Sequence, residues 1–392
     1  NSYSLSYIRV LYAMWLVRTV LSYLLTYRKS LLIADQKEYI ASITGLILNV
    51  VSYLAIILLV TWEQNYLLAL GIGTVTEVVL NIWISWYVEQ KYPFLRQRRK
   101  EKSTSSLTKR IVRDLKSLFI SRISEKMLYC TDNLIISGFI GVGTVGRYAN
   151  YCMITQAISN ILTILANTIQ PTVGDYFTEK NRQRNYEILR QLTFGFFCIA
   201  SVVSVGLFSL ITPFVRDIWL GPSYELGWGI TVFCIVVLLV RIMGLPLSLV
   251  MGVTGLFEKE KNVGASSALL NLIVSLALVK PYGMAGVLLG TLLSYLLQIL
   301  YRYIIYFRDF LEMPGEALRY AQDIGEYLAV IAGEVLLMQK IVPLIYGAGG
   351  MLLFCVCFLL CIAIPLLLDL VIFGRGWRLQ SIVTMVKGMR KA

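Results

Sequence analysis

Residues 228–253 read WGITVFCIVVLLVRIMGLPLSLVMGV, an almost continuous apolar stretch that carries one charged side chain, Arg241. A helix rises about 1.5 Å per residue, so about 20 apolar residues cross the hydrocarbon core of a bilayer, which is roughly 30 Å thick. Other stretches of the chain have the same length and character. Together they predict eleven membrane spans, at residues 5–27, 39–60, 66–87, 117–140, 145–171, 190–212, 228–253, 262–280, 284–306, 321–345 and 349–373.

The composition agrees with this interpretation. Hydrophobic residues make up 57% of the 392 residues and charged residues only 15%, which is unlike a water-soluble protein of this length. Lipid admits only helices or closed barrels, because every backbone polar group must be satisfied within the protein. Since the apolar stretches have helical length, the sequence predicts an all-α polytopic membrane protein with about eleven transmembrane helices.

Basic residues are distributed unevenly between the loops. Most of the 36 Lys and Arg residues lie in alternate gaps between the spans, so these gaps face the cytoplasm by the positive-inside rule. The C-terminus is then cytoplasmic. The net charge of +13 therefore reports topology and attraction to the anionic inner leaflet, and we expect no nucleic-acid partner. The basic residues on the opposite side are Arg9, Arg147, Arg216, Lys280 and Lys340.

The composition also excludes several classes of enzyme. The chain has no His, which removes Ser-His-Asp and Cys-His catalysis and most zinc sites. Its seven Cys lie within the spans and have no metal-ligand spacing. The run GVGTVG at 141–146 fits a dinucleotide-binding fingerprint, but it lies in a tight turn between two spans. The outer loops are too short for the catalytic domain of a membrane polymerase or glycosyltransferase. Little folded material lies outside the membrane, so chemistry or transport must occur within the helix bundle, and we expect no catalytic site, metal or cofactor.

Polar residues enter the predicted spans in a helical pattern, and such residues are functional-site hypotheses because their burial in lipid is costly. In the span 117–140, Arg122, Glu125, Lys126, Tyr129 and Asp132 recur every three or four residues and form one polar face. The next span repeats the pattern with amides and a hydroxyl, at Gln156, Asn160, Thr163, Asn167 and Gln170. Two neighbouring helices are therefore expected to present polar stripes.

Further charged residues lie at mid-depth in other spans, at Arg18, Glu77 and Arg241. An excess of cations at mid-depth favours a cavity that receives an anion, since Arg pairs well with phosphate oxygens. The alternative is that Glu125 neutralises Lys126 or Arg122, and Glu77 neutralises Arg18, so that the pairs only hold helices together.

Two acidic residues, Glu334 and Asp369, lie nearer the ends of the last two spans, and we expect their carboxylates to reach the membrane interface. In the span 284–306, Gly286 and Gly290 have the spacing of a close helix contact.

Three segments resemble bacterial polysaccharide (O-antigen or capsule) flippases of the multidrug/oligosaccharidyl-lipid/polysaccharide exporter superfamily. The first is YRKSLLIADQKEY at 27–39. The second is TDNLIIS at 131–137, followed by VGRYANY at 145–151, and the third is IQPTVGD at 169–175. The segments occur in the order of that family, and the resemblance extends over most of the chain.

The resemblance implies a fold of fourteen helices, in two six-helix lobes followed by an extra helix pair. The spans correspond to helices 4 to 14 of that plan, so the first three helices are expected to be missing. The implied division is a residual N-terminal lobe of three helices, a basic cytoplasmic linker with an amphipathic helix, a six-helix C-terminal lobe, and the extra pair with a basic tail. These regions are 1–95, 96–116, 117–310 and 311–392.

The resemblance also implies a function. Such proteins move an undecaprenyl-diphosphate-linked oligosaccharide from the cytoplasmic to the outer leaflet of the bacterial plasma membrane, by alternating access around a cationic cavity. The expected partners are this lipid-linked oligosaccharide, membrane lipids, and the polysaccharide polymerase and glycosyltransferases of the pathway. The residues that match these roles are Arg122, Lys126, Arg241, Arg18 and Arg147 for the headgroup, Asn150, Tyr151, Gln156, Asn160 and Asn167 for the sugars, and Asp132, Glu77 and Glu125 for ion coupling.

Three alternatives stay open at this point. A cation-coupled drug exporter of the same superfamily is expected to favour acidic over basic residues in its cavity. A lipid II-type flippase carries the same diphosphate, so charge alone does not separate it from a polysaccharide flippase. A non-functional remnant of a truncated gene is compatible with the missing helices.

Overall fold

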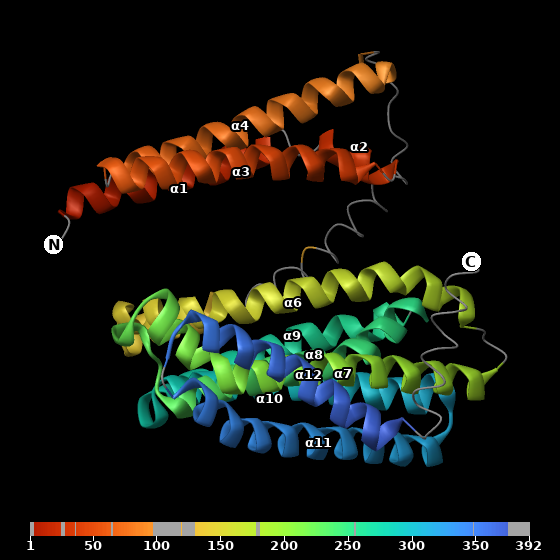
Figure 1. Cartoon of the computed structure of the whole chain (residues 1–392). Coiled ribbons are helices and arrows are strands. Elements are labelled where there is room, and N and C mark those ends of the chain that lie inside the picture. Colours follow the sequence, from red (N-terminus) through yellow and green to blue (C-terminus); the bar gives the residue numbers. More distant parts are fainter. Residues whose placement is uncertain are drawn as a thin grey trace. The chain divides into compact units, whose positions relative to one another are not determined.

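The computed structural model describes residues 4–24, 28–35, 37–63, 66–96, 119, 130–177, 181–254, 256–347 and 349–374, which are almost entirely helical (Figure 1). Within these ranges 9 helices are long and apolar enough to cross a membrane. This result confirms the predicted all-α polytopic fold. The nine spans are Tyr39–Trp62, Tyr66–Lys91, Val142–Gly174, Arg182–Trp219, Trp228–Val253, Val263–Tyr282, Met284–Leu311, Pro314–Tyr346 and Met351–Phe373.

Two of the predicted spans are not among these nine. Residues Leu5–Leu24 form a helix, but this helix carries Arg9 and Arg18 and is not among those apolar enough to cross a membrane. The span predicted at 117–140 lies mostly outside the described residues, and its described part, 130–139, is helical. Arg122, Glu125 and Lys126 therefore lie outside the described residues.

The chain divides into two compact units, Asn1–Ser105 and Ser106–Ala392. The finer division into four regions stays a prediction. The helices of the first unit are α1 (Leu5–Leu24), α2 (Lys29–Ala34), α3 (Glu38–Glu63), α4 (Tyr66–Lys91) and the 3-10 turn η2 (Pro93–Arg96). In this unit α4 packs against α1, α2 and α3.

The first family-like segment, 27–39, binds to the end of α4. Leu32 is fully buried with Ile84 and Val88 in the small core of the first unit. The Arg28 guanidinium forms an ion pair with Glu89 at 2.6 Å. These contacts explain why the segment carries both apolar and charged residues.

A second pair of contacts links this loop to the residue after α4. The Tyr92 hydroxyl donates to the Asp35 carboxylate at 2.6 Å, and Lys37 donates to the same oxygen. The hydrogen bond from Lys37, and to a smaller extent the one from Tyr92, lowers the pKa of the Asp35 carboxyl below its ordinary value. The hydrogen bond to Asp35 raises the pKa of Lys37.

The second unit contains the helices that carry the candidate site. They are α6 (Val142–Tyr176), α7 (Arg182–Pro213), the π-helical turn η3 (Phe214–Trp219), η4 (Pro222–Tyr224), α8 (Trp228–Val253), α9 (Phe257–Tyr282), α10 (Met284–Ile304), η5 (Ile305–Leu311), α11 (Pro314–Tyr346) and α12 (Met351–Phe373).

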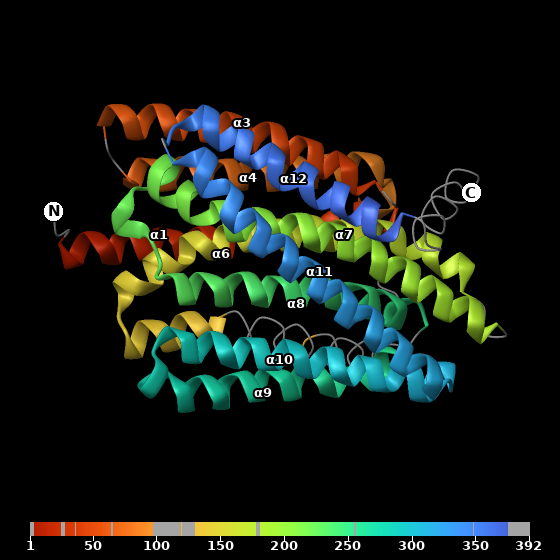
Figure 2. The same ribbon diagram turned by 60° about the horizontal axis from the view of Figure 1, so that its bottom comes forward.

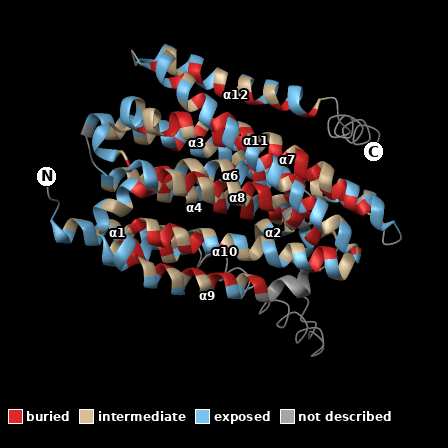
Figure 3. Ribbon diagram, turned by 90° about the horizontal axis from the view of Figure 1, so that it is seen from below, coloured by how far each residue is buried: buried red, intermediate tan, exposed pale blue. Residues whose placement is uncertain are grey.

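Helix α8 lies at the centre of this unit and packs against α6, α7 and α10, while α7 also packs against α11 and α12 (Figure 2). Buried residues are accordingly concentrated along α7 and α8 (Figure 3). The other helices expose long apolar side chains, such as Leu344 and Leu352. In a membrane these side chains contact acyl chains, so the unit buries its polar groups between helices.

Local sequence signals account for several helix ends. The Asn181 side chain accepts a hydrogen bond from the backbone N–H of Arg184 and begins α7. Pro314 occupies the first turn of α11, where a missing N–H leaves no hydrogen bond unmade. Gly283 joins α9 to α10 with a φ of 57°, a backbone conformation that favours glycine.

Helices α9 and α10 approach each other closely where two glycines face α9. A Cβ on Gly286 would overlap the carbonyl group of Leu278, and a Cβ on Gly290 would overlap the Ser275 hydroxyl. The predicted close contact at these glycines is confirmed. The approach brings the backbones near enough for short polar side chains to meet between them.

Candidate functional site

Helix α6 carries the predicted polar stripe beside its buried face. This amide stripe consists of Gln156, Asn160, Thr163, Asn167 and Gln170. The side chains of Ser159, Leu162 and Ala166 are buried in the unit, whereas Asn160 and Asn167 are exposed. Gln156 is half-buried and its amide donates to the Asn160 side-chain oxygen at 2.8 Å. The stripe therefore offers amide groups at an accessible surface of the second unit.

The two sugar-contact candidates at the start of α6 are placed differently. The Asn150 amide donates to the carbonyl oxygen of Gly146 at 3.1 Å, within the same helix. Tyr151 is fully buried, and its hydroxyl accepts a hydrogen bond from the backbone N–H of Leu226 at 3.2 Å. This hydroxyl is used in packing the segment before α8, which differs from the expected sugar contact, because a phenol ring in a span is as suited to the core as to a ligand.

Arg241 lies in the middle of α8 and is half-buried. Its guanidinium carbon is 5.4 Å from the centre of the Tyr295 ring on α10. An aromatic face stabilises a cation, and a guanidinium group in such a position suits the recognition of an anion.

Helix α6, which carries the amide stripe, packs against α8, which carries Arg241. A Cβ on Gly252 of α8 would contact the amide of Gln170, the last member of the stripe. Arg241 precedes Gly252 by about three helical turns, roughly 16 Å, and therefore points from the same face of α8. Since α6 and α8 also meet at Tyr151 and Leu226, they run in the same direction, and Arg241 lies level with the middle of the stripe.

A second polar site lies between α9, α10 and the helical residues 130–139. The Asp132 side chain is 4% exposed, and the Thr291 hydroxyl donates to its carboxylate at 2.7 Å. The amide nitrogen of Asn271 lies 3.4 Å from the other carboxylate oxygen and 2.9 Å from the Thr291 hydroxyl. No ion pair neutralises Asp132 among the residues that the structure describes.

Further oxygen atoms surround this carboxylate. The Asn271 side-chain oxygen is buried and has no hydrogen-bond partner within the described part of the chain. The Ser275 hydroxyl donates to the carbonyl oxygen of Val287 at 3.2 Å, one turn from Thr291. A set of carboxylate, amide, hydroxyl and carbonyl oxygens suits a hard cation and also suits a proton held on the carboxylate.

Sequence analysis identified Asp132 but missed Asn271, Ser275 and Thr291. A signal was present, because Ser267, Asn271 and Ser275 recur every four residues in a predicted span and therefore share one helix face. Their connection to Asp132 required the close approach of α9 and α10.

The other charged candidates are placed in different surroundings. The Arg18 guanidinium of α1 lies against Gly73 of α4, one helical turn from Glu77. Neither Arg18 nor Glu77 forms an ion pair with any residue in the described ranges, so mutual neutralisation is not observed. Arg147 is exposed in the first turns of α6.

Two acidic residues were expected at the membrane interface, and this expectation was wrong. Glu334 of α11 and Asp369 of α12 are each 3% exposed. Both face α7, because the three helices pack on one another and leave short acidic side chains no path to the interface.

The comparisons with known proteins agree with the motifs and with the helical architecture. Residues 1–177 match the family described as polysaccharide biosynthesis protein. This stretch contains all three family-like segments, so the resemblance is confirmed. None of the curated proteins matches the sequence.

The solved structures that are similar in fold include one described as lipid II flippase MurJ in an inward closed conformation. The two structures superpose with a TM-score of 0.65 and share 14% sequence identity. The alignment covers 88% of this chain and 70% of the flippase chain. At this identity the similarity concerns the fold alone.

Proposed function

We propose that this chain moves a lipid-linked oligosaccharide across the bacterial plasma membrane, from the cytoplasmic to the outer leaflet, in the synthesis of a surface polysaccharide such as O-antigen or capsule. The proposal is carried by the half-buried Arg241 of α8 together with the amide stripe of α6, the helix that packs against α8. The match of residues 1–177 to polysaccharide biosynthesis proteins supports the same function.

The chemistry of these side chains suits a diphosphate attached to sugars. A diphosphate cannot enter hydrocarbon without groups that replace its water, and a half-buried guanidinium provides charge-assisted hydrogen bonds to phosphate oxygens. The amides of Gln156, Asn160 and Asn167 both donate and accept hydrogen bonds, as sugar hydroxyls require. The lipid tail would stay in the bilayer, beside apolar helix faces.

Arg122, Lys126, Arg18 and Arg147 are proposed as further headgroup contacts, in states of the transport cycle that open to either side of the membrane. Sequence places Arg122 and Lys126 on the same helix as Asp132. The C-terminal tail is proposed to lie in the cytoplasm, where glycosyltransferases would supply the substrate, and a polymerase would use the product on the outer side.

Asp132 is proposed to couple transport to the binding of a cation, Na⁺ or H⁺, with Glu77 and Glu125 as further candidates for ion coupling. Its carboxylate is held by Thr291 and Asn271 on two other helices, so a bound cation would draw three helices together. A ligand that binds one arrangement of helices better than another shifts the population toward that arrangement.

A lipid II-type flippase is the second candidate, because a similar solved structure is of a lipid II flippase. Both substrates contain a lipid diphosphate, so both predict the same role for Arg241. The test must therefore compare the two substrates directly.

The experiment reconstitutes the full chain in vesicles and measures translocation of a fluorescent undecaprenyl-diphosphate oligosaccharide and, separately, of fluorescent lipid II. We expect Arg241→Ala, and the double variant Arg122→Ala with Lys126→Ala, to lower the rate at least tenfold. Arg241→Lys should retain part of the rate if charge suffices and little if two-point contact is needed. Arg319→Ala is the matched control, because Arg319 is exposed and contacts Glu316 on its own helix.

Unchanged translocation in both alanine variants would remove these cations as headgroup ligands. Faster translocation of lipid II than of the oligosaccharide would favour the second candidate. Translocation of neither substrate by the unmodified chain would contradict the proposed function.

A further inference from the structure

A pair of carboxylates is buried where α7, α11 and α12 meet, on other helices than Asp132 and Arg241. Glu334 comes from α11, Asp369 from α12, and Ser201 from α7. The Ser201 hydroxyl donates to Oε2 of Glu334 at 2.6 Å. Asp369 lies close enough to Glu334 and Ser201 to interact electrostatically with both, while the Ser201 hydroxyl donates its hydrogen bond to Glu334.

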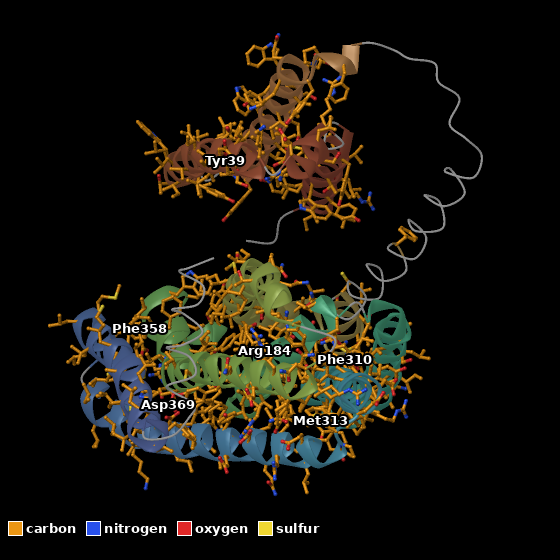
Figure 4. All side chains as sticks on the ribbon, turned by 90° about the vertical axis from the view of Figure 1, so that its right-hand side faces the viewer. Tyr39, Arg184, Phe310, Met313, Phe358 and Asp369 are labelled. Carbon is orange, nitrogen blue, oxygen red and sulfur yellow. The ribbon has the colours of Figure 1, made fainter. Side chains whose placement is uncertain are left out.

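The surroundings of this pair contrast with the exposed surface of the same helix. Figure 4 labels Asp369 and Phe358, which both lie on α12. Phe358 is 51% exposed and Asp369 only 3%, so the acidic group is the one that the bundle covers. In a membrane the exposed phenylalanine contacts acyl chains, whereas the carboxylate is kept away from them. A buried carboxyl group needs a polar partner or a proton.

The protein leaves most of these oxygen atoms without a hydrogen-bond donor. Oε1 of Glu334 and both carboxylate oxygens of Asp369 have no hydrogen-bond partner among the described residues. Neither residue forms an ion pair within the same ranges. Three buried carboxylate oxygens therefore accept no hydrogen bond from the described residues.

The neighbouring groups do not supply the missing charge. On α7, Cys198 faces both carboxylates, and it is not a cation. On α11, Tyr327 lies about two turns from Glu334 and stacks on Phe197. The nearest described cation on α7 is Arg190, about three turns from Ser201, and it forms two hydrogen bonds with Asp323.

Two carboxylates that lie close together in an apolar site cannot both be ionised, because each disfavours the charge of the other and burial disfavours both. We propose that Glu334 and Asp369 form a membrane-buried proton-binding site, in which one exchangeable proton is shared between the two carboxyl groups. The proton comes from water, and its loss returns it to water, so no other reactant is needed. Ser201 hydrogen-bonds Glu334 and leaves Oε1 to share the proton with Asp369.

A proton fits this site better than a metal ion does. The Ser201 hydrogen atom is directed at Glu334, and within the described residues no group of three or more Asp, Glu, Cys or His side chains is placed to hold a metal ion. With the proton bound, one hydrogen bond joins α11 to α12 beside α7. Without it, two negative charges repel each other and push α11 and α12 apart.

This site does not depend on the proposed transport function, and its first test needs neither a substrate nor a variant. The infrared spectrum of the full chain in lipid vesicles at pH 7 should contain the C=O stretch of a protonated carboxylic acid, with a shift in D₂O. The band should weaken as the pH is raised, and the double variant Glu334→Gln with Asp369→Asn should remove the contribution of this site. A spectrum with only ionised carboxylates at pH 7 would overturn the proposal.

The second test uses dicyclohexylcarbodiimide, which reacts with protonated carboxyl groups in apolar surroundings. We expect labelling of Glu334 or Asp369, found by mass spectrometry of the digested protein, to be at least tenfold greater than labelling of Asp323 or Asp35. Asp323 is the matched control, because it is also buried but is paired with Arg190. Equal labelling of Asp323 would contradict the proposal, and so would protection of the pair by Na⁺ at constant pH, which would indicate a metal site.

Discussion

The second unit contains two sites with buried carboxylates, and the groups around them differ. Asp132 receives hydrogen bonds from a threonine and an asparagine on two other helices, and further oxygen atoms lie close by. The Glu334 and Asp369 carboxylates together receive one hydrogen bond, from Ser201. Burial is almost the same in both places. The difference teaches that burial alone does not define the ligand, since the number of surrounding donors and acceptors decides whether a cation or a proton fits.

A fourth buried carboxylate, Asp323, is satisfied by an ion pair, and removing its cation gives the largest expected effect. Arg190 is bidentate to Asp323, and the two side chains are 21% and 8% exposed. Arg190→Met leaves Asp323 unpaired, so we expect the free energy of unfolding to fall by about 3 kcal/mol. Chemical unfolding in detergent micelles measures this change. The double variant Arg190→Met with Asp323→Leu should recover most of it, and no recovery would show that the loss comes from packing.

The next prediction distinguishes the Asp132 site from the Glu334 and Asp369 site by the response of protein stability to cations. If Asp132 binds a cation, a concentration near 100 times the dissociation constant should stabilise the protein by about 2.7 kcal/mol. Asp132→Asn should abolish this stabilisation, and Asp369→Asn should leave it intact. Thermal unfolding in a series of NaCl concentrations, with KCl as the control for ionic strength, checks both outcomes. A salt response that disappears in the Asp369→Asn variant would reverse the assignment of the two sites.

A smaller effect tests whether the Asp132 site depends on the close approach of α9 and α10. Gly290→Leu forces the helices apart, because even a Cβ there overlaps the Ser275 hydroxyl. We expect a loss of about 1–3 kcal/mol in stability together with the loss of the cation response. Gly325→Leu on α11 is the matched control, since a Cβ at Gly325 meets nothing within 4 Å. An unchanged cation response in Gly290→Leu would mean that Asn271 and Thr291 are not needed.

The smallest effect is expected at Asp35, an exposed carboxylate with two donors. Hydrogen bonds from Lys37 and Tyr92 lower its pKa, so its contribution to stability is present above the ordinary Asp pKa and is lost as the pH falls through the lowered value. Asp35→Asn should therefore differ slightly from the unmodified protein at neutral pH and become indistinguishable from it in acid. Thermal unfolding between pH 7 and strongly acidic pH measures this. A larger effect here than at Asp323 would contradict the ranking by burial.

Much of the fold was predictable because each membrane span is a local property of the chain. The stretch around Arg241 needs only its own apolar side chains to be identified as a helix in lipid. The same holds for the amide stripe of α6, whose spacing of three and four residues places Asn160 and Asn167 on one face without reference to other helices.

The partners of the polar groups were not predictable in this way. Asp132 meets Thr291, which is 159 residues later in the chain, and Tyr151 meets Leu226 instead of a ligand. Glu334 and Asp369 appeared to lie near helix ends, because depth along a helix is visible in sequence whereas rotation about its axis toward a neighbour is not.

The amino-acid sequence by itself determined the membrane-spanning helices, their polar faces and the resemblance to polysaccharide flippases. Only the tertiary structure decided which polar faces meet, and therefore that Asp132 has oxygen-rich surroundings while Glu334 and Asp369 have one hydroxyl between them. The physical reason is that hydrophobicity drives each helix into lipid independently of its neighbours. Contacts between helices depend on close packing and a few hydrogen bonds, which many rotations of the same apolar helix would permit.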